Sequence, residues 1–316
     1  MKAVLAIDIG GTKIRVGLVA VDGTVIHAET SPSLAHKGAS EALMQMCDAV
    51  QGTQLYAANA GIAIYAIGIS SAGAVDAKRG VVVSATDAIP QWAGTNLRAF
   101  FTQGLELECA VDNDARCALI GELWRGVQPE NDVDAPTVML TLGTGLGGAM
   151  MVNNQVLAGA HFLAGHLGRT IVWDSSTQQY CPLEYLVSGT GLLNIYSQLA
   201  CAKQFPIADG HALIHAVEHG EAAVKALAVK ALAQWVAHLA RAIVNLSWLL
   251  DPRQIIIGGG VIEAKHLWWD QLLAAVEKSD LPTKRMVLSP AALGNDAGMI
   301  GAAKLAWQKV DGAQLS

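Results

Sequence analysis

The sequence contains few charged residues and lacks any block of basic ones. Charged side chains make up 15% of the 316 residues, and the formal net charge is −6. A nucleic-acid-binding protein favours a basic face, so we expect no nucleic-acid partner. Hydrophobic residues make up 52% of the chain. That share excludes a disordered chain and is enough to bury a large core, with room for two domains at this length.

Targeting segments and paired cysteines are also lacking. Met1-Lys2 runs directly into a short apolar run, with no signal peptide or cleavage site after it. The uncharged stretch 51–75 is long enough to raise the question of a membrane span, but glycines, Asn59 and two serines interrupt it, which favours a buried strand. The five cysteines show no paired spacing, as is typical of free thiols in a reducing cytoplasm. We therefore expect a cytoplasmic protein with no membrane partner.

A glycine-rich turn, Asp8-Ile-Gly-Gly-Thr-Lys13, stands between two apolar runs near the start of the chain. Paired glycines between strand-like runs predict a tight hairpin, because glycine adopts positive φ at little cost. The bare backbone N–H groups of such a tip can hold a phosphate. Thr12 adds a hydroxyl donor, Lys13 adds a cation, and Asp8 could hold Mg²⁺ directly or through water. An ordinary Gly-Gly hairpin is the alternative interpretation.

The same pattern recurs in residues 138–152, where an apolar run, the tip Gly143-Thr-Gly-Leu-Gly-Gly148 and a second apolar run precede an Asn153-Asn154 turn. Two glycine tips built alike, each opening a domain-sized half, indicate a duplicated phosphate-binding unit. Neither is a Walker P-loop, because no Gly-Lys-Ser/Thr follows, and the second tip does not open a helix as a dinucleotide fingerprint does.

The remaining pattern alternates buried strands with helices. After the strand at 62–69 we expect a polar loop, 70–76, at the strand end where α/β sheets bind ligands, although a plain connection is equally compatible. Asp112-Asn-Asp114 lies at a strand-to-helix junction, where capping is the favoured role for Asn113. Ser40 is a plausible N-cap for a helix that follows it. The apolar stretch 221–250 predicts a core or subunit-packing helix. Further strands are expected at 24–30, 80–84, 109–111 and 254–257, loops at 86–92 and 127–136, and helices at 115–124, 192–200 and 297–308.

Together these stretches resemble the ROK family of bacterial sugar kinases, from Ala3 to about Ala306. The pieces that carry the resemblance are Asp8–Lys13, Asp112–Asp114, Leu142–Gly148, Ile257–Val261 and Asn295–Gly298. The resemblance implies an α/β chain with the two-domain actin/hexokinase-like ATPase fold, a ribonuclease H-like duplicated core and a cleft between the domains. It implies a small domain of residues 1–112 plus about 296–316, and a large domain of about 113–295.

The resemblance also implies ATP and Mg²⁺ as cofactors and a role for each motif. The hairpins would grip the ATP phosphates from opposite domains, with Thr12 and Thr144 on the β- and γ-phosphates and Mg²⁺ near Asp8. Asp114 would be the catalytic base that accepts the proton of the sugar hydroxyl. The implied ATP-site residues are Asp8, Gly10, Gly11, Thr12, Lys13, Gly143, Thr144, Gly145, Gly258, Gly259 and Gly260. The implied sugar-site residues are Gly73, Thr86, Asn113, Asp114, His166, Arg169 and Glu184.

Two departures from the family pattern bear on substrate and metal. The family usually has Ala-Gly-Glu-x-Gly-His where this chain has Ala-Gly-His166-Leu-Gly-Arg169, and many members then carry a three-cysteine zinc loop where this chain has only Cys181. We therefore expect no structural zinc. The His variant, with Ile89 and Trp92, is similar to N-acetylmannosamine kinases of sialic acid catabolism. That similarity makes the 6-hydroxyl of N-acetylmannosamine the predicted acceptor.

Other functions stay open at this point. A glucokinase, another ROK hexokinase, or a catalytically impaired sugar sensor in which Arg169 has ended catalysis would fit the same motifs. No helix-turn-helix segment precedes Met1, which argues against the DNA-binding repressor branch of the family. An actin-like filament or chaperone ATPase is disfavoured by the grouping of Asn113, Asp114 and Glu184. From the resemblance alone we expect a homodimer through the long apolar helix region.

Overall fold

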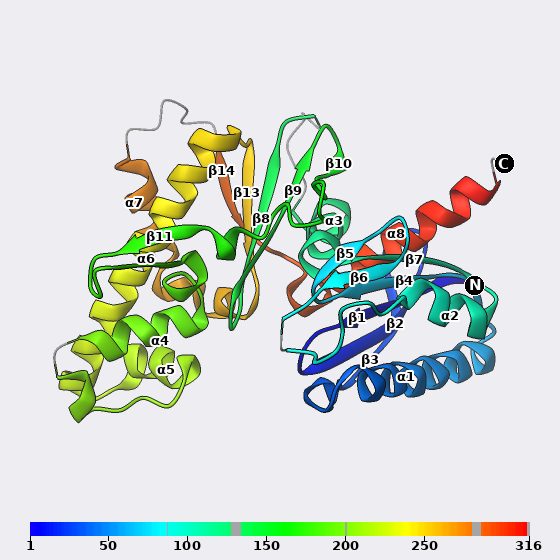
Figure 1. Cartoon of the computed structure of the whole chain (residues 1–316), viewed down its shortest axis with the longest axis horizontal. Coiled ribbons are helices and arrows are strands. Elements are labelled where there is room, and N and C mark those ends of the chain that lie inside the picture. Colours follow the sequence, from blue (N-terminus) through cyan, green and yellow to red (C-terminus); the bar gives the residue numbers. More distant parts are fainter. Residues whose placement is uncertain (87, 128–133, 200, 280–285, 315–316) are drawn as a thin grey trace. The chain divides into compact units, whose positions relative to one another are not determined.

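The computed structural model describes the whole chain except residues 87, 128–133, 200, 280–285 and 315–316 (Figure 1). The described residues form two compact units. The first contains residues 1–128, 158–163 and 295–316, and the second contains residues 129–157 and 164–294. Most of the loop expected at 127–136 lies outside the described residues, as does Asp87 of the irregular segment 86–92.

The first unit is built on a five-stranded sheet in the order β3-β2-β1-β4-β7. The predicted opening of three antiparallel strands is confirmed, and β4 and β7 then extend the sheet parallel to β1. Ser70 and Ser71, expected in a loop, belong to β4, because the strand continues in register with β1 to its end. The strands are β1 Lys2–Ile9, β2 Lys13–Val19, β3 Val25–Pro32, β4 Ala63–Ser71 and β7 Glu108–Asn113.

Alternate side chains of β1 point to opposite faces of this sheet, and each face is covered by helices. Leu5 and Ile7 pack in the cluster that contains Met46 of α1, whereas Val4 packs with Trp307 of α8. Helix α1 begins at Ala39 after Gly38, so the predicted cap at Ser40 is wrong. The helices are α1 Ala39–Asn59, α2 Leu97–Leu105, α3 Asp114–Arg125 and α8 Ala297–Gln314, with a small hairpin of β5 Ala74–Asp76 and β6 Val81–Ser84 (Figure 1).

Helix α3 belongs to this unit, although the sequence boundary at residue 112 assigned it to the other domain. Glycines let α3 and β4 approach α8 closely. A methyl group at Gly301 would overlap the carbonyl oxygen of Cys117, one at Gly121 would overlap that of Ala297, and one at Gly68 would overlap the α8 backbone. This contact between α3 and α8 is the physical reason for the grouping, because the backbones touch without intervening side chains.

The second unit repeats the strand order of the first: β10-β9-β8-β13-β14. An antiparallel hairpin, β8 and β9, again leads, with a short edge strand beside it and two strands parallel to the first on the other side. The strands are β8 Thr137–Leu142, β9 Leu146–Val152, β10 Gln155–Val156, β13 Gln254–Gly258 and β14 Val287–Pro290. The duplication that two similar glycine tips suggested therefore extends to the topology of both sheets.

Helix α6, Ala222–Leu250, forms the core of the second unit. Trp235 is fully buried, donates its indole N–H to the Ser188 carbonyl at 3.0 Å and meets Trp268 edge-on. By length and composition α6 could cross a membrane, with a mean hydropathy of 1.3, but half of that window is buried inside the unit, as in a core helix. The other elements are β11 Ile171–Asp174, β12 Gln179–Pro182, α4 Gly189–Gln198, α5 Gly210–His219 and α7 Trp269–Glu277.

Candidate functional site

The first glycine tip closes the β1–β2 hairpin, and one of its amides is used to fix the turn. The Gly10 N–H donates to the Lys13 carbonyl at 3.0 Å, which fixes the turn. Across the described residues, the N–H groups of Gly11 and Thr12 donate no hydrogen bond, and the side chains of Thr12 and Lys13 are exposed. Two free amides, a hydroxyl and an ammonium at one tip match the donors that a phosphate requires.

Asp8 lies at the end of β1, beside this tip. It is held by Ser70 of β4, whose hydroxyl donates to Oδ1 at 2.5 Å, because Asp8 and Ser70 are register partners in the parallel pair. A methyl group at Gly298, in the first turn of α8, would overlap the carboxylate. Burial raises the pKa of Asp8 from 3.8 to about 6, opposed by the Ser70 bond and assisted by the charge of Asp114.

The junction of β7 and α3 presents the predicted base. Asn113 caps α3 by accepting from the Arg116 N–H at 3.2 Å, so the favoured capping role is confirmed. Its amide nitrogen donates to the Gly73 carbonyl at 2.8 Å and to Oδ1 of Asp114 at 2.7 Å. The same Oδ1 accepts from the Ala115 N–H at 2.8 Å, while the Asp114 side chain stays exposed. Both hydrogens of the Asn113 side-chain amide are therefore donated within the protein, and one of these bonds orients Asp114.

A buried ion pair that the sequence reasoning missed supports this junction. Arg116, 1% exposed, donates to Oδ1 of Asp112 at 2.8 Å and to the carbonyl oxygens of Val75 and Phe162 at 3.3 and 2.7 Å. Burial raises the pKa of Asp112, and the nearby guanidinium opposes that rise. The i, i+4 spacing of the two residues across the start of the predicted helix was the available signal.

The segment after β6 lies against the first glycine tip. A methyl group at Gly11 would meet the Ala88 Cβ at 3.2 Å, so Gly11 contacts this segment directly. Trp92 is fully buried and donates its indole N–H to the Ser71 hydroxyl at 3.0 Å, which fastens the segment to the end of β4. Thr86 is exposed, and its hydroxyl accepts the Ala88 N–H at 3.4 Å.

The second glycine tip, between β8 and β9, has the same character. The Gly143 N–H donates to the Gly145 carbonyl at 3.0 Å, and Gly189 at the start of α4 donates to the Gly143 carbonyl at 2.7 Å. Over the described part of the chain, the N–H groups of Thr144 and Gly145 make no donor bond, and both residues are exposed. Each unit therefore offers one hairpin tip with a threonine and two unpaired amides.

Three of the predicted sugar-binding residues, His166, Arg169 and Glu184, belong to the second unit. Segment 164–169 lies along β9, because a methyl group at Gly165 would touch the Gly148 carbonyl at 2.6 Å. Nη1 of Arg169 lies 3.5 Å from Oε1 of Glu184. The other carboxylate oxygen of Glu184 would lie 2.9 Å from a methyl group on Gly145, so Glu184 also borders the second glycine tip. The structure thus joins Arg169, Glu184 and the glycine tip. His166, at the N-terminal side of the short turn 167–169, has partners of its own.

The glycine run after β13 has a packing reason that the sequence did not show. Gly259 has φ +87°, and a methyl group there would overlap the backbone of Leu142, at the end of β8. Gly258 is buried against Met139 and Ala291, whereas Gly260 has open space around its α-carbon. Close packing therefore gives Gly258 and Gly259 a structural reason, while Gly259 and Gly260 are both exposed and stay candidates for contact with a nucleotide.

The donor set of the first unit fits a hydrated divalent cation that accompanies a nucleotide. The charge of Asp114 helps to raise the pKa of the Asp8 carboxyl, and a bound cation would favour the ionised form of Asp8. Among the described residues no group of three His, Cys, Asp or Glu side chains gathers as a metal site. Cys181 on β12 is a free thiol, and burial raises its pKa.

The doubled sheet order and the two hairpin tips define a hexokinase-like α/β fold, and comparison with known proteins agrees. The solved structure of a ROK family glucokinase from Streptomyces griseus, in complex with glucose and AMPPNP, has a TM-score of 0.79 at 26% identity over 97% of this chain and 99% of that one. A Listeria monocytogenes protein, provisionally described as an N-acetylmannosamine kinase, has a TM-score of 0.79 at 25% identity over 98% and 99%. The predicted fold class is confirmed.

Sequence comparison identifies the family. The model of the ROK family matches residues 4–309, which is nearly the whole chain. The glucokinase of Thermotoga maritima is 27% identical over 326 residues, which cover 98% of each chain. The chain therefore belongs to the ROK family, as its motifs predicted.

Proposed function

We propose that this protein is an ATP-dependent sugar kinase that phosphorylates a hexose or N-acetylhexosamine. The observation that carries the proposal is the pair of hairpin tips, each with a threonine and two unpaired amides, in a chain that also presents Asp114. Backbone amides cradle phosphate oxygens and stabilise charge that develops during phosphoryl transfer. The relatives named glucokinase support the same class of reaction.

In this proposal each residue has a chemical task. Thr12, Thr144 and the tip amides bind phosphate oxygens of ATP, and Asp8 holds Mg²⁺, which neutralises phosphate charge when bound. Asp114 accepts the proton of the attacking sugar hydroxyl. It is the first residue of α3, and the hydrogen bond from Asn113 fixes its orientation.

We propose N-acetylmannosamine as the substrate and its 6-hydroxyl as the acceptor. The ion pair between Arg169 and Glu184 supports an N-acyl sugar, because a guanidinium only donates hydrogen bonds and the pair occupies part of the acceptor capacity of Glu184. A sugar carbonyl supplies the acceptor that such a site lacks. His166 can add a further N–H donor toward the acyl group. The similarity to the Listeria protein is consistent with this choice.

The test is release of ADP, coupled to NADH oxidation, from Mg-ATP with N-acetylmannosamine, N-acetylglucosamine, glucose, mannose, fructose and allose. Preference for N-acetylmannosamine is expected. Turnover of a different sugar would keep the kinase and refute the substrate. Sugar binding without turnover would instead indicate a sensor, and ATP hydrolysis that ignores every sugar would refute the kinase.

A substitution at His166 tests the acyl contact directly. His166→Glu is expected to lower the ratio of kcat/KM for N-acetylmannosamine to that for glucose by about tenfold, the effect of losing one hydrogen bond to a polar group. His219→Glu, at an exposed histidine in the last position of α5, makes the same change in charge at the end of that helix opposite Gly210 and serves as the control. An unchanged ratio in His166→Glu would contradict the assignment.

The assembly is proposed to be a homodimer through the region of α6. Trp248 and Leu249 near its C-terminal end are 63% and 76% exposed and are adjacent in the chain, so a partner subunit there would bury two large apolar side chains. Sedimentation velocity of the wild-type protein and of Trp248→Ser tests it. A monomer in both samples would refute the dimer.

A further inference from the structure

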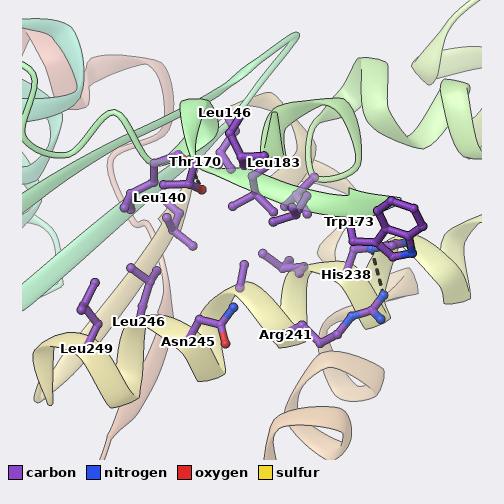
Figure 2. A pocket seen from close by; sticks show the side chains of 16 residues that line it. Leu140, Leu146, Thr170, Trp173, Leu183, His238, Arg241, Asn245, Leu246 and Leu249 are labelled. Atoms are coloured by element: carbon purple, nitrogen blue, oxygen red, sulfur yellow. Dashed lines mark hydrogen bonds between the residues drawn. The ribbon is translucent and has the colours of Figure 1, made fainter. Parts of the chain in front are cut away.

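The second unit contains a pocket that the proposed function does not use. It has a volume of about 460 Å³ and lies between α6 and β11 (Figure 2). Pockets of this size hold small organic molecules. Sixteen residues line it, among them Leu167, Thr170, Leu183, Ala242, Asn245 and Leu249.

The lining is mostly apolar, with the uncharged polar side chains of Thr170 and Asn245 among the leucines and the charged group at one end. Figure 2 shows Trp173, His238 and Arg241 together there, with Leu246 and Leu249 toward the other end. Arg241 donates to Nδ1 of His238 at 2.9 Å, and none of the sixteen lining residues is acidic. An apolar cavity with a single cation at its edge suits a ligand that has an apolar body and one negative charge.

The charges that face this end are few. Burial lowers the pKa of His238, Arg241 lowers it further, and Asp174 opposes both. The imidazole is therefore neutral at neutral pH and can accept from Arg241. Asp174 already accepts hydrogen bonds from the hydroxyls of Ser176 at 2.6 Å and Thr177 at 2.9 Å. Those bonds keep Asp174 ionised, but it lines a neighbouring hollow and not this pocket, so the charged group in the lining is the guanidinium of Arg241.

The pocket shares its wall with residues that bind sugar in the proposed function, on which this step rests. Leu167 lines the pocket from the segment that carries Arg169, and Leu183 lines it from the position before Glu184. The Leu183 N–H donates to the Thr170 carbonyl at 2.7 Å, so the two segments are joined at the wall itself. A ligand that displaces this wall moves the Arg169–Glu184 pair.

We propose that this pocket is a regulatory site for a small amphipathic anion, with an apolar body among the leucines and its charge on Arg241. Occupancy then changes the affinity of the second unit for sugar. The coupling needs no long pathway, because the pocket wall and the sugar residues are neighbours in the chain and in space.

The test uses 8-anilinonaphthalene-1-sulfonate, a fluorescent molecule with this shape and one charge. Saturable binding to the full-length protein is expected. N-phenyl-1-naphthylamine has the same rings without the sulfonate and reports the apolar contribution alone. Absence of saturable dye binding would overturn the proposal, including the case in which a second copy of the chain covers the pocket, which sedimentation velocity would identify.

Two variants distinguish the pocket from other apolar surface. Ala242→Phe fills the cavity and is expected to abolish saturable binding of both dyes. Arg241→Gln, at an exposed position that tolerates change, is expected to weaken the sulfonate dye about threefold, as for an exposed charge pair, and to leave the uncharged dye unchanged. Lys230→Gln removes a charge elsewhere on the exposed surface of α6 and is the control. Equal binding by all variants would overturn the proposal.

Calorimetric titration of N-acetylmannosamine with and without saturating sulfonate dye tests the coupling. A change of at least threefold in the sugar Kd is expected in the wild-type protein and none in Ala242→Phe. An unchanged Kd in the wild-type protein would refute regulation. Because dye binding is measured without sugar, failure of the proposed substrate would show as absent sugar binding in the sample without dye, and failure of the kinase activity would show only in the ADP-release assay.

Discussion

Replacing Asp8 with asparagine is expected to stabilise the protein while removing activity. The carboxylate lies at the end of β1, where burial holds its pKa near 6. Asparagine has nearly the same shape, and its Oδ1 can still accept the Ser70 hydroxyl, so the substitution removes charge with little loss of packing. A site that is costly to the fold and needed for function is a common stability–activity trade-off.

The magnitude follows from the pKa. A carboxyl group whose pKa rises from 3.8 to about 6 on folding lowers the free energy of unfolding by about 3 kcal/mol when it is ionised in both states. Because the folded pKa is the higher one, the folded state gains relative stability as pH falls through 6 toward 3.8. Asp8→Asn is therefore expected to gain about 3 kcal/mol at pH 8 and about half of that at pH 5.

Urea unfolding at both pH values, followed by tryptophan fluorescence without nucleotide, measures this gain. Asp22→Asn is the matched control, because hydrogen bonds from Thr24 lower the pKa of that exposed carboxyl group. Removing the Asp22 charge is therefore expected to lower the free energy of unfolding, and this loss becomes smaller at low pH. Sugar-dependent ADP release by Asp8→Asn should fall by about 100-fold or more. A variant no more stable than wild type at pH 8 would refute the reasoning, as would a gain that is equal at the two pH values.

Three further substitutions test the first unit. Arg116→Met leaves Asp112 buried and unpaired, so we expect a loss of about 3–5 kcal/mol in urea unfolding, smaller at low pH where Asp112 takes up a proton; an equal loss at pH 8 and pH 5 would contradict this. Gly301→Ala should cost about 1–3 kcal/mol, because the methyl group meets the α3 backbone; wild-type stability would show that the helices separate easily. Trp92→Phe should lower the free energy of unfolding by about 1 kcal/mol, because the hydrogen bond to Ser71 is lost. Thermal unfolding measures this, and no change would refute the stabilising role of that bond.

Local sequence was sufficient for the hairpins and for the cap at α3. Glycine pairs between apolar runs leave few alternatives to a tight turn, and Asn before a helix caps it, so both features follow from interactions within a few residues. The start of α1 was misplaced at Ser40 because Gly38 ends the preceding segment without any side-chain cap. The polar ending of β4 was read as a loop because strand pairing with β1, which holds it extended, is not local.

By itself, the sequence determined the family, the duplicated hairpins and the types of residue available to bind phosphate, because short contiguous motifs specify all three. Tertiary structure decided what those residues do. Parallel pairing of β1 with β4 brought Ser70 to Asp8, and the turn beside Glu184 brought Arg169 within reach of it. Contacts between residues distant in the chain depend on register and packing, which no single stretch of sequence specifies.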